Sequence, residues 1–225
     1  MPPAALWRAS LPEAVTRQSP RPAWFPAWHG ETCLIAASGP SAGDADLRIA
    51  RSRCRVLVVN TSWRLAPWAD ALFACDYGWW RQEGGCPHFR GLKISGDHRT
   101  SSEWPNVHSV TIRRGDDRMV FDEFGVVGWG GNSGFHALNL TVQFGVSRVL
   151  LVGFDMSLSG GDHWHGRHSG GLNNPRQSGV ERWRRSLDGA APALQRAGVE
   201  VVNCSSASAL QAYPKIDLEE ALCAN

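Results

Sequence analysis

The stretch TCLIAASGPSAGDAD, residues 32–46, decides the fold that the sequence predicts. It starts with an apolar run that has no polar alternation, which is typical of a strand buried on both faces of a sheet. Ser38 and Gly39 then form a turn, and Pro40 stands near the first helical position, where its missing N–H costs nothing. We therefore predict a buried strand, a glycine turn and a helix over 41–51.

The same alternation continues along the chain. Further strands are predicted over 55–60, 70–76, 91–95, 107–113, 148–155 and 199–204. A short helix or a turn is predicted over 77–84, and helices are predicted over 133–145 and 180–198, the last with a break or kink near Gly189 and Pro192. Apolar strands that alternate with helices indicate an α/β fold with a doubly wound, mostly parallel, Rossmann-like sheet.

Two segments fall outside this alternation. Residues 1–31 hold six prolines and three tryptophans, so we predict an irregular N-terminal arm that packs on the domain through Trp24, Phe25 and Trp28. Residues 156–179 are rich in glycine, histidine and asparagine and show no periodicity, so we predict a lid segment there. Residues 32–225 then form one Rossmann-like domain.

Composition excludes several classes of protein. The net charge of +2 predicts no strong attraction to nucleic acid or to a membrane. No apolar run approaches the roughly 18–20 residues of a membrane-spanning helix, and the N-terminus lacks the pattern of a signal peptide. The six cysteines are scattered without a CxxC pair, which is typical of reduced thiols in a cytoplasmic protein.

Polar residues follow the predicted strands at their carboxyl ends. In a doubly wound sheet these ends share one edge, and ligands bind beyond that edge. We therefore expect a site at the edge where these residues gather: Ser38, Gly39, Asn60, Asp76, Asp155 and Asn203.

Two glycine-rich turns could each bind a phosphate. Gly39 allows close approach of a ligand, and Ser41 can hydrogen-bond an incoming group or cap the following helix. A second turn, GWGGNSG over 128–134, leads into another helix N-terminus, whose N–H groups and dipole favour anions. Together they could hold the two ends of a nucleotide, and the alternative is a pair of ordinary turns. The second turn contributes Asn132, Ser133 and Gly134.

The lid segment contains three histidines within six positions, His163, His165 and His168. An imidazole there could act as a general base near neutral pH. The spacing H-x-H-x-x-H, with Asp155 and Asp162 nearby, could instead bind a metal ion, and solvated or structural histidines are the third alternative.

These motifs, taken in order, resemble a known family. S-G-P-S after the first strand, VVN ending the second, the SG helix start, GFD, the histidine-bearing segment and VNCSSASAL resemble the small bacterial sialyltransferases, which use a CMP-linked sugar donor. The order also resembles the 6-hydroxymethylpterin diphosphokinase-like group, marked by G-x-G-P-S-L. N-x-x-W-R-L-A-P-W-A-D and H-W-H-G resemble a set of prophage proteins. The likeness covers roughly residues 32–214.

The resemblance implies a role for each matching residue. The donor phosphate and ribose would bind at Ser38, Gly39, Pro40 and Ser41, with further nucleotide contacts at Asn60, Asp76, Asn132, Ser133, Gly134 and Asp155. A lid histidine would deprotonate the acceptor hydroxyl, with His168 preferred, then His165, then His163. The chain departs from the sialyltransferase pattern at Ser38 and Asp76, where the family has asparagine, and at Met156, where it has tyrosine. The donor sugar therefore stays open.

The sequence thus predicts a glycosyltransferase-like enzyme that uses a CMP- or other NDP-linked sugar, with a glycan or a modified nucleic acid as acceptor. Arg167 or Arg176 would offset charge on the leaving phosphate. Mg²⁺ is not required; if it is used, the available oxygen ligands are Asp76, Asp155 and Asp162. The alternatives are an Mg²⁺- and ATP-dependent diphosphokinase of the pterin type and a non-catalytic phage assembly or interaction protein. The expected location is the cytoplasm, that of the host cell for a phage protein, and homo-oligomer formation stays open.

Overall fold

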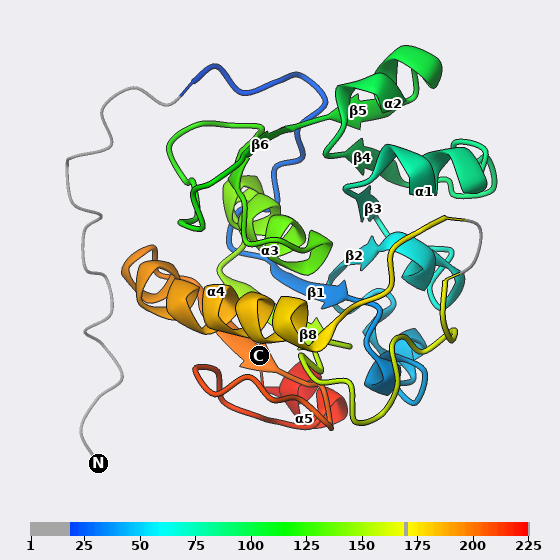
Figure 1. Ribbon diagram of the computed structural model, residues 1–225. Helices are drawn as coiled ribbons and strands as arrows, with labels where there is room; N and C mark the ends of the chain where they lie inside the picture. The colour runs from blue at the N-terminus through cyan, green and yellow to red at the C-terminus, as the bar shows by residue number, and fades with distance from the viewer. Residues whose placement is uncertain (1–18, 169–170, 225) are drawn as a thin grey trace.

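A parallel sheet of seven strands forms the centre of the computed structural model, which describes residues 19–168 and 171–224 (Figure 1). The strand order is β5-β4-β3-β2-β1-β8-β9, and every neighbouring pair is parallel. The bounds are β1 Thr32–Ala36, β2 Arg55–Val59, β3 Ala71–Ala74, β4 Leu92–Ser95, β5 Val107–Ser109, β8 Arg148–Val152 and β9 Glu200–Asn203. The predicted α/β class and parallel sheet are confirmed.

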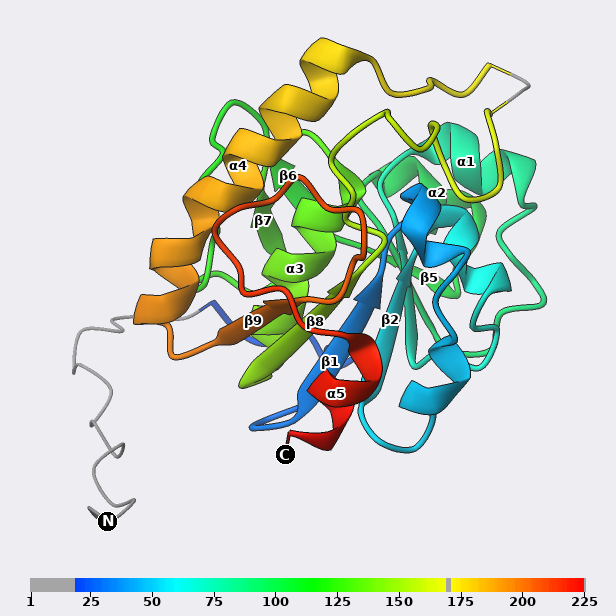
Figure 2. The ribbon, with the colours of Figure 1, turned by 90° about the horizontal axis from the view of Figure 1, so that it is seen from below.

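Both faces of the sheet are covered, which explains the apolar strands. Alternate residues of β1 point to opposite faces, so Ile35 packs in the cluster of α3 (Ser133–Phe144) and α4 (Gln177–Arg196), whereas Leu34 packs in that of α1 (Tyr77–Gln82) and α5 (Leu218–Cys223). Figure 2 shows α3 and α4 on one side of the strands and α5 on the other. The sheet is therefore doubly wound.

The helix predicted over 41–51 is wrong. The segment forms two short 3₁₀ turns, Pro40–Ala42 and Leu47–Ala50. The first turn stops at Gly43, and Asp46 starts the second by accepting a hydrogen bond from the N–H of Arg48 at 3.0 Å. Glycine and aspartate both favour turns and caps over a helix interior, which explains the interruption.

Three other predicted boundaries differ. The strand predicted over 107–113 breaks at buried Val110, where β5 ends and β6 (Thr111–Arg113) begins a separate two-stranded sheet with β7 (Val126–Gly128). Helix α4 begins at Gln177, so the lid segment ends at 176, and it runs without a break through Gly189 and Pro192. The sequence reading did not predict α2 (His98–Glu103), β7 or α5.

The described part of the arm, residues 19–31, contains neither helix nor strand and packs on the domain as predicted. Phe25 and Trp28 are buried and meet Phe144 of α3 edge to face. Trp24 is half-buried and stacks on His108 with 4.6 Å between ring centroids. Residues 1–18 of the predicted arm lie outside the described residues. Across the described ranges, no helix combines the length and apolar character needed to cross a bilayer.

Candidate functional site

The order of the strands places a crevice between β1 and β8. The chain proceeds outward from β1 to β5 on one side, and β8 and β9 add on the other, so the topology reverses between β1 and β8. Ligands of open parallel sheets bind beyond the carboxyl ends of the strands at such a point. A cavity of about 350 Å³ opens there, within the usual range for small-molecule sites.

Most of the predicted site residues line this cavity. They are Ser38, Gly39, Pro40, Asn60, Asp76, Asn132, Ser133, Gly134, Asp155, His163 and His168. Ser41 and His165 are not among the lining residues, and neither is Asn203, which is buried and accepts a hydrogen bond from the N–H of Ser205. The cavity also has lining residues that the sequence reading did not select, including Trp183 near the start of α4.

The first glycine turn is occupied by a side chain of the protein itself. Asp155 follows β8, and its Oδ2 accepts a hydrogen bond from the N–H of Ser41 at 3.0 Å. The N–H of Gly39 donates to the carbonyl oxygen of Gly153 at 2.9 Å. The φ of Gly39 is −61°, which any residue can adopt, but an added Cβ would overlap Oδ2 of Asp155 and lie 2.5 Å from that carbonyl oxygen. Gly39 therefore makes room for Asp155 and Gly153.

Asp155 also presents an unpartnered atom. The residue is 4% exposed, and its Oδ1 has no hydrogen-bond partner in the described chain. The buried hydroxyl of Ser41 likewise lacks a partner among the described residues. Buried polar atoms are usually paired, so the unpaired Oδ1 of Asp155, a residue that lines the cavity, indicates a place for a polar ligand or water.

The second glycine turn retains the features of an anion site. Asn132 caps α3 by accepting from the N–H of Phe135 at 2.9 Å, which leaves the N–H groups of Ser133 and Gly134 without partners inside the helix. Gly131 has a φ of +75°, and a Cβ there would overlap Nη1 of Arg182. The dipole of a twelve-residue helix therefore favours negative charge here, whereas the guanidinium of Arg182 is already paired with Asp117 at 2.7 Å.

The lid segment is anchored to the first glycine turn. The N–H of Trp164 donates to the carbonyl oxygen of Ser38 at 3.1 Å, and its Nε1 donates to Oγ of Ser62 at 3.1 Å. Ser62 is fully buried and in turn donates to the carbonyl oxygen of Ala37 at 2.9 Å. No sequence motif marks Ser62, because its partners are distant in the chain. These contacts hold the lid segment beyond the carboxyl ends of the strands (Figure 2).

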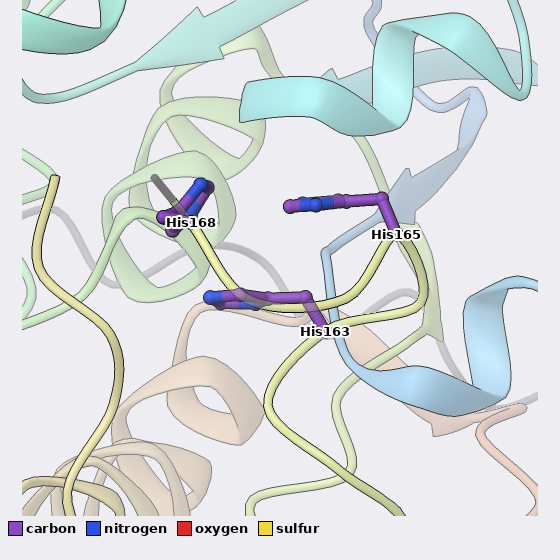
Figure 3. A group of neighbouring side chains, drawn as sticks. All are labelled: His163, His165 and His168. Atoms are coloured by element: carbon purple, nitrogen blue, oxygen red, sulfur yellow. The ribbon is translucent and has the colours of Figure 1, made fainter. Parts of the chain in front are cut away.

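The three histidines of the lid segment gather in one cluster (Figure 3). The rings of His163 and His165 are stacked with 5.1 Å between centroids, and His168 lies 4.6 Å from the first and 5.0 Å from the second. Burial lowers the pKa of His163 to about 4, with His168 and His165 adding to the effect. Burial is also the main cause that lowers the pKa of His165 and His168. All three imidazoles are therefore neutral near pH 7.

The titratable side chains that line the cavity are acidic apart from His163 and His168. Asp76, Asp155 and Asp162 line it, and no lysine or arginine does so within the described ranges. Burial raises the pKa of Asp76. Arg167 and Arg176, expected to face the leaving phosphate, do not line the cavity, and Arg167 forms an ion pair with Asp162 at 3.2 Å.

Two lining residues hold an unusual backbone conformation. Asn60 has a φ of 51° and Met156 a φ of 48°. Asparagine tolerates this left-handed region, whereas methionine pays a steric cost there. Such conformations gather at functional sites, where the surrounding structure holds them in place.

A larger hollow, of about 1150 Å³, lies along α4 and is separate from the predicted site. Its lining mixes Arg182, Arg185 and Arg196 with small and apolar side chains, and it includes none of the predicted site residues. The cavity beside β1 and β8 is the better candidate, because it has the unpaired polar atoms, the helix terminus and the histidines. Comparisons with protein-family models, curated proteins and solved structures find no match for this chain.

Proposed function

We propose that the protein is a glycosyltransferase-like enzyme that binds a nucleotide-linked sugar in the cavity beside β1 and β8. The observation that carries the proposal is that one cavity brings together the N-terminus of α3, polar side chains from the strand ends and two of the lid histidines. This combination supplies an anion site, hydroxyl-binding groups and proton acceptors within one small space.

The donor phosphate is assigned to the N-terminus of α3. The first-turn N–H groups of Ser133 and Gly134, together with the dipole of α3, favour negative charge at this end. At the other end, the carboxylate of Asp155 already occupies the N–H of Ser41 and would repel a phosphate. We therefore propose one phosphate site, at the N-terminus of α3, instead of a nucleotide held between two helix termini.

The ribose and the base are assigned to the acidic part of the cavity. Carboxylates such as Asp76 and Asp155 accept hydrogen bonds from ribose hydroxyls or from a base amino group. Trp183 offers an aromatic ring on which a base or a sugar can stack. The acidic lining thus fits the neutral, hydroxyl-rich parts of a nucleotide sugar.

Sugar transfer needs a group that accepts a proton and a group that stabilises a leaving anion. The acceptor hydroxyl attacks the anomeric carbon, a new C–O bond forms, and the bond from that carbon to the donor phosphate oxygen breaks. The histidine cluster takes the hydroxyl proton, and the α3 N-terminus stabilises the released nucleotide phosphate. His163 and His168 line the cavity and His165 does not, so the first two can meet the acceptor.

Ligand-induced stabilisation tests this proposal directly. The protein is heated with CMP, UDP, GDP, ADP and their sugar conjugates, each with its parent nucleoside as the control. A nucleotide at 100 times its Kd adds about 2.7 kcal/mol, which raises the Tm by about 5–10 °C for a chain of this size. A flat response to all of these nucleotides at millimolar concentration overturns the proposal.

Ser133→Asp sharpens the test. The helix dipole stabilises a carboxylate in the first turn, so the variant should fold as well as the wild type. It should nevertheless lose the response to the nucleotide, because two negative charges would meet at one site. Ser133→Asn is the neutral control and should keep most of the response. Equal responses from both variants would contradict the assignment of the phosphate to α3.

The acidic lining also favours the second candidate, a diphosphokinase. Asp76, Asp155 and Asp162 carry the hard oxygen donors that Mg²⁺ prefers, and Mg²⁺ would neutralise the phosphates of ATP. This candidate requires Mg²⁺ for nucleotide binding and consumes ATP, whereas the glycosyltransferase releases a nucleotide from a sugar conjugate. Nucleotide binding in EDTA with no ATP consumption selects the glycosyltransferase.

A further inference from the structure

We propose that His163, His165 and His168 bind one transition-metal ion of the Zn²⁺ class, with a fourth coordination position open to the cavity. The three side chains come from a single segment and lie close together, with the rings of His163 and His165 nearly parallel (Figure 3). One ring nitrogen from each can be chosen so that all three lie within 4.8 Å of one another. Of the described residues, these three form the group with this property.

The separation is close to what zinc requires. Three nitrogens bound tetrahedrally at 2.0–2.1 Å lie about 3.4 Å apart. The nitrogens must therefore approach by about 1 Å or a little more, and the stacked rings of His163 and His165 must turn so that both lone pairs point at one ion; rotation about the side-chain bonds supplies both movements. Nε2 of His163 and Nε2 of His165 are buried and have no hydrogen-bond partner in the described chain, so this movement breaks no hydrogen bond at those atoms.

A metal ion also explains why the rings gather. Buried nitrogens without partners cost free energy, and Nε2 of His163 and Nε2 of His165, whose rings are stacked, are two such atoms. A cation between them would bond to these lone pairs. Burial and mutual repulsion keep the imidazoles neutral, which is the form that binds metal.

The segment that carries the cluster is held at both ends. Trp164, between the first two histidines, is hydrogen-bonded to Ser38 and Ser62. The N–H of His168 donates to Oδ1 of Asn174 at 2.7 Å, and Nδ2 of Asn174 returns a bond to the carbonyl oxygen of His168 at 3.1 Å. Irregular backbone fixed in this way can position ligands as a helix or strand does.

The chemistry of the ligands selects the kind of ion. Imidazole nitrogens suit Zn²⁺ and its neighbours, whereas Mg²⁺ and Ca²⁺ prefer oxygen. The cavity lining has carboxylates and no lysine or arginine among the described residues, so the ion would supply positive charge that the lining lacks. A hydroxyl group bound at the open position would have a lowered pKa, and in that state the imidazoles bind metal instead of acting as free bases.

The metal site stands without the proposed function, since it rests on the histidines alone. Metal content is measured by mass spectrometry on the purified full-length chain, which is then dialysed against EDTA and titrated with Zn²⁺ and with Co²⁺. We expect one ion per chain, a higher melting temperature with Zn²⁺, and visible absorption bands of four- or five-coordinate Co²⁺.

Single replacements identify the ligands. Each of the three replacements should weaken Zn²⁺ affinity by at least about 100-fold: His163→Ala, His165→Ala and His168→Ala. Removing a residue that merely hydrogen-bonds a metal ligand already lowers metal affinity by about 10–100-fold. His88→Ala, at an exposed histidine outside the cluster, is the matched control and should bind as the wild type does. Urea unfolding of each variant without metal verifies that the variant is folded. If His165→Ala does not fold, His165→Gln is used in its place.

Two results would overturn the metal site. One is the absence of saturable binding at Zn²⁺ concentrations up to about 100 µM, far above the dissociation constants of typical zinc sites. The other is binding that survives any one of the three cluster replacements. Nucleotide-dependent stabilisation is measured on the same EDTA-treated protein. If nucleotides bind and metal does not, the metal site alone fails. If metal binds and no nucleotide does, the proposed function alone fails.

Discussion

Replacing Gly39 by alanine should destabilise the protein even when no ligand is present. A phosphate-binding glycine leaves space that only the ligand fills, so alanine there would weaken ligand binding and spare the free protein. The structure places Asp155 and Gly153 in that space instead. A glycine required for phosphate binding and a glycine required for contact with Asp155 and Gly153 therefore predict different stabilities for the ligand-free Gly39→Ala protein.

The size of the effect follows from the contacts. A methyl group on Gly39 would overlap Oδ2 of Asp155 and lie 2.5 Å from the carbonyl oxygen of Gly153, whereas real Cβ atoms keep at least 3.0 Å. Moving Asp155 away breaks its bond to the N–H of Ser41, and a hydrogen bond to a charged group is worth about 1.5–3 kcal/mol. The backbone at Gly153 cannot rotate away as a side chain does. We expect a loss of about 3 kcal/mol in the free energy of unfolding.

Urea unfolding followed by tryptophan fluorescence measures this loss. Gly189→Ala is the matched control, because it lies inside α4 with no atom within 4 Å of its added Cβ. It should stabilise the chain by about 0.5–1 kcal/mol, as alanine does in a helix. In an Asp155→Ala background, Gly39→Ala should cost less than in the wild type. A Gly39→Ala protein that unfolds at the wild-type urea concentration would refute the reasoning.

Three further outcomes are expected. Burial lowers the pKa of His136 to about 4 from its ordinary 6.5, so its contribution to stability is complete above pH 6.5 and is lost as the pH falls toward 4. The difference between the two pKa values corresponds to about 3 kcal/mol of unfolding free energy. His136→Gln should therefore reduce the fall in unfolding free energy between pH 7 and pH 4, measured by urea unfolding, and an unchanged dependence on pH would contradict this. Asn139→Ala should cost about 3 kcal/mol in urea unfolding, because fully buried Asn139 bonds the backbone of Val120 and Gly128; a loss below about 1 kcal/mol would contradict this. Asp76→Asn should unfold at the same or a higher urea concentration at pH 7, because burial raises the pKa of Asp76 and makes its charged form costly, while nucleotide-sugar affinity falls; a clear loss of stability would show that Asp76 has a structural role.

The sheet and the edge that carries the site could be predicted from local sequence. The apolar runs of β1 and β8 have no polar alternation, so they must be buried on both faces, and only a parallel sheet covered by helices provides that. Helix α3 was also predicted, from its apolar face and from Gly145 as its C-terminal stop, whereas the structure shows that Asn132 is its N-cap. Since parallel strands share a carboxyl edge, the polar residues that follow them had to gather there.

Several features depended on contacts that no local pattern reports. Pro192 marks a break by its own geometry, yet α4 continues through it. The helix expected over 41–51 gives way to short turns. Ser62 and Trp164 are 102 positions apart, and their hydrogen bond fixes the lid segment over the first glycine turn.

The sequence by itself determined the strands of the central sheet, the helices α3 and α4, the burial of the sheet and the edge at which a site would form, because periodicity and turn chemistry act over a few neighbouring residues. Tertiary structure alone decided how that edge is used. Asp155 reaches across 114 positions to the N–H of Ser41 and occupies the first glycine turn, which is why the proposed phosphate site lies at the N-terminus of α3. The same folding brings three histidine rings to within about 5 Å of one another. Such contacts depend on where distant segments meet, which the packing of the whole domain sets.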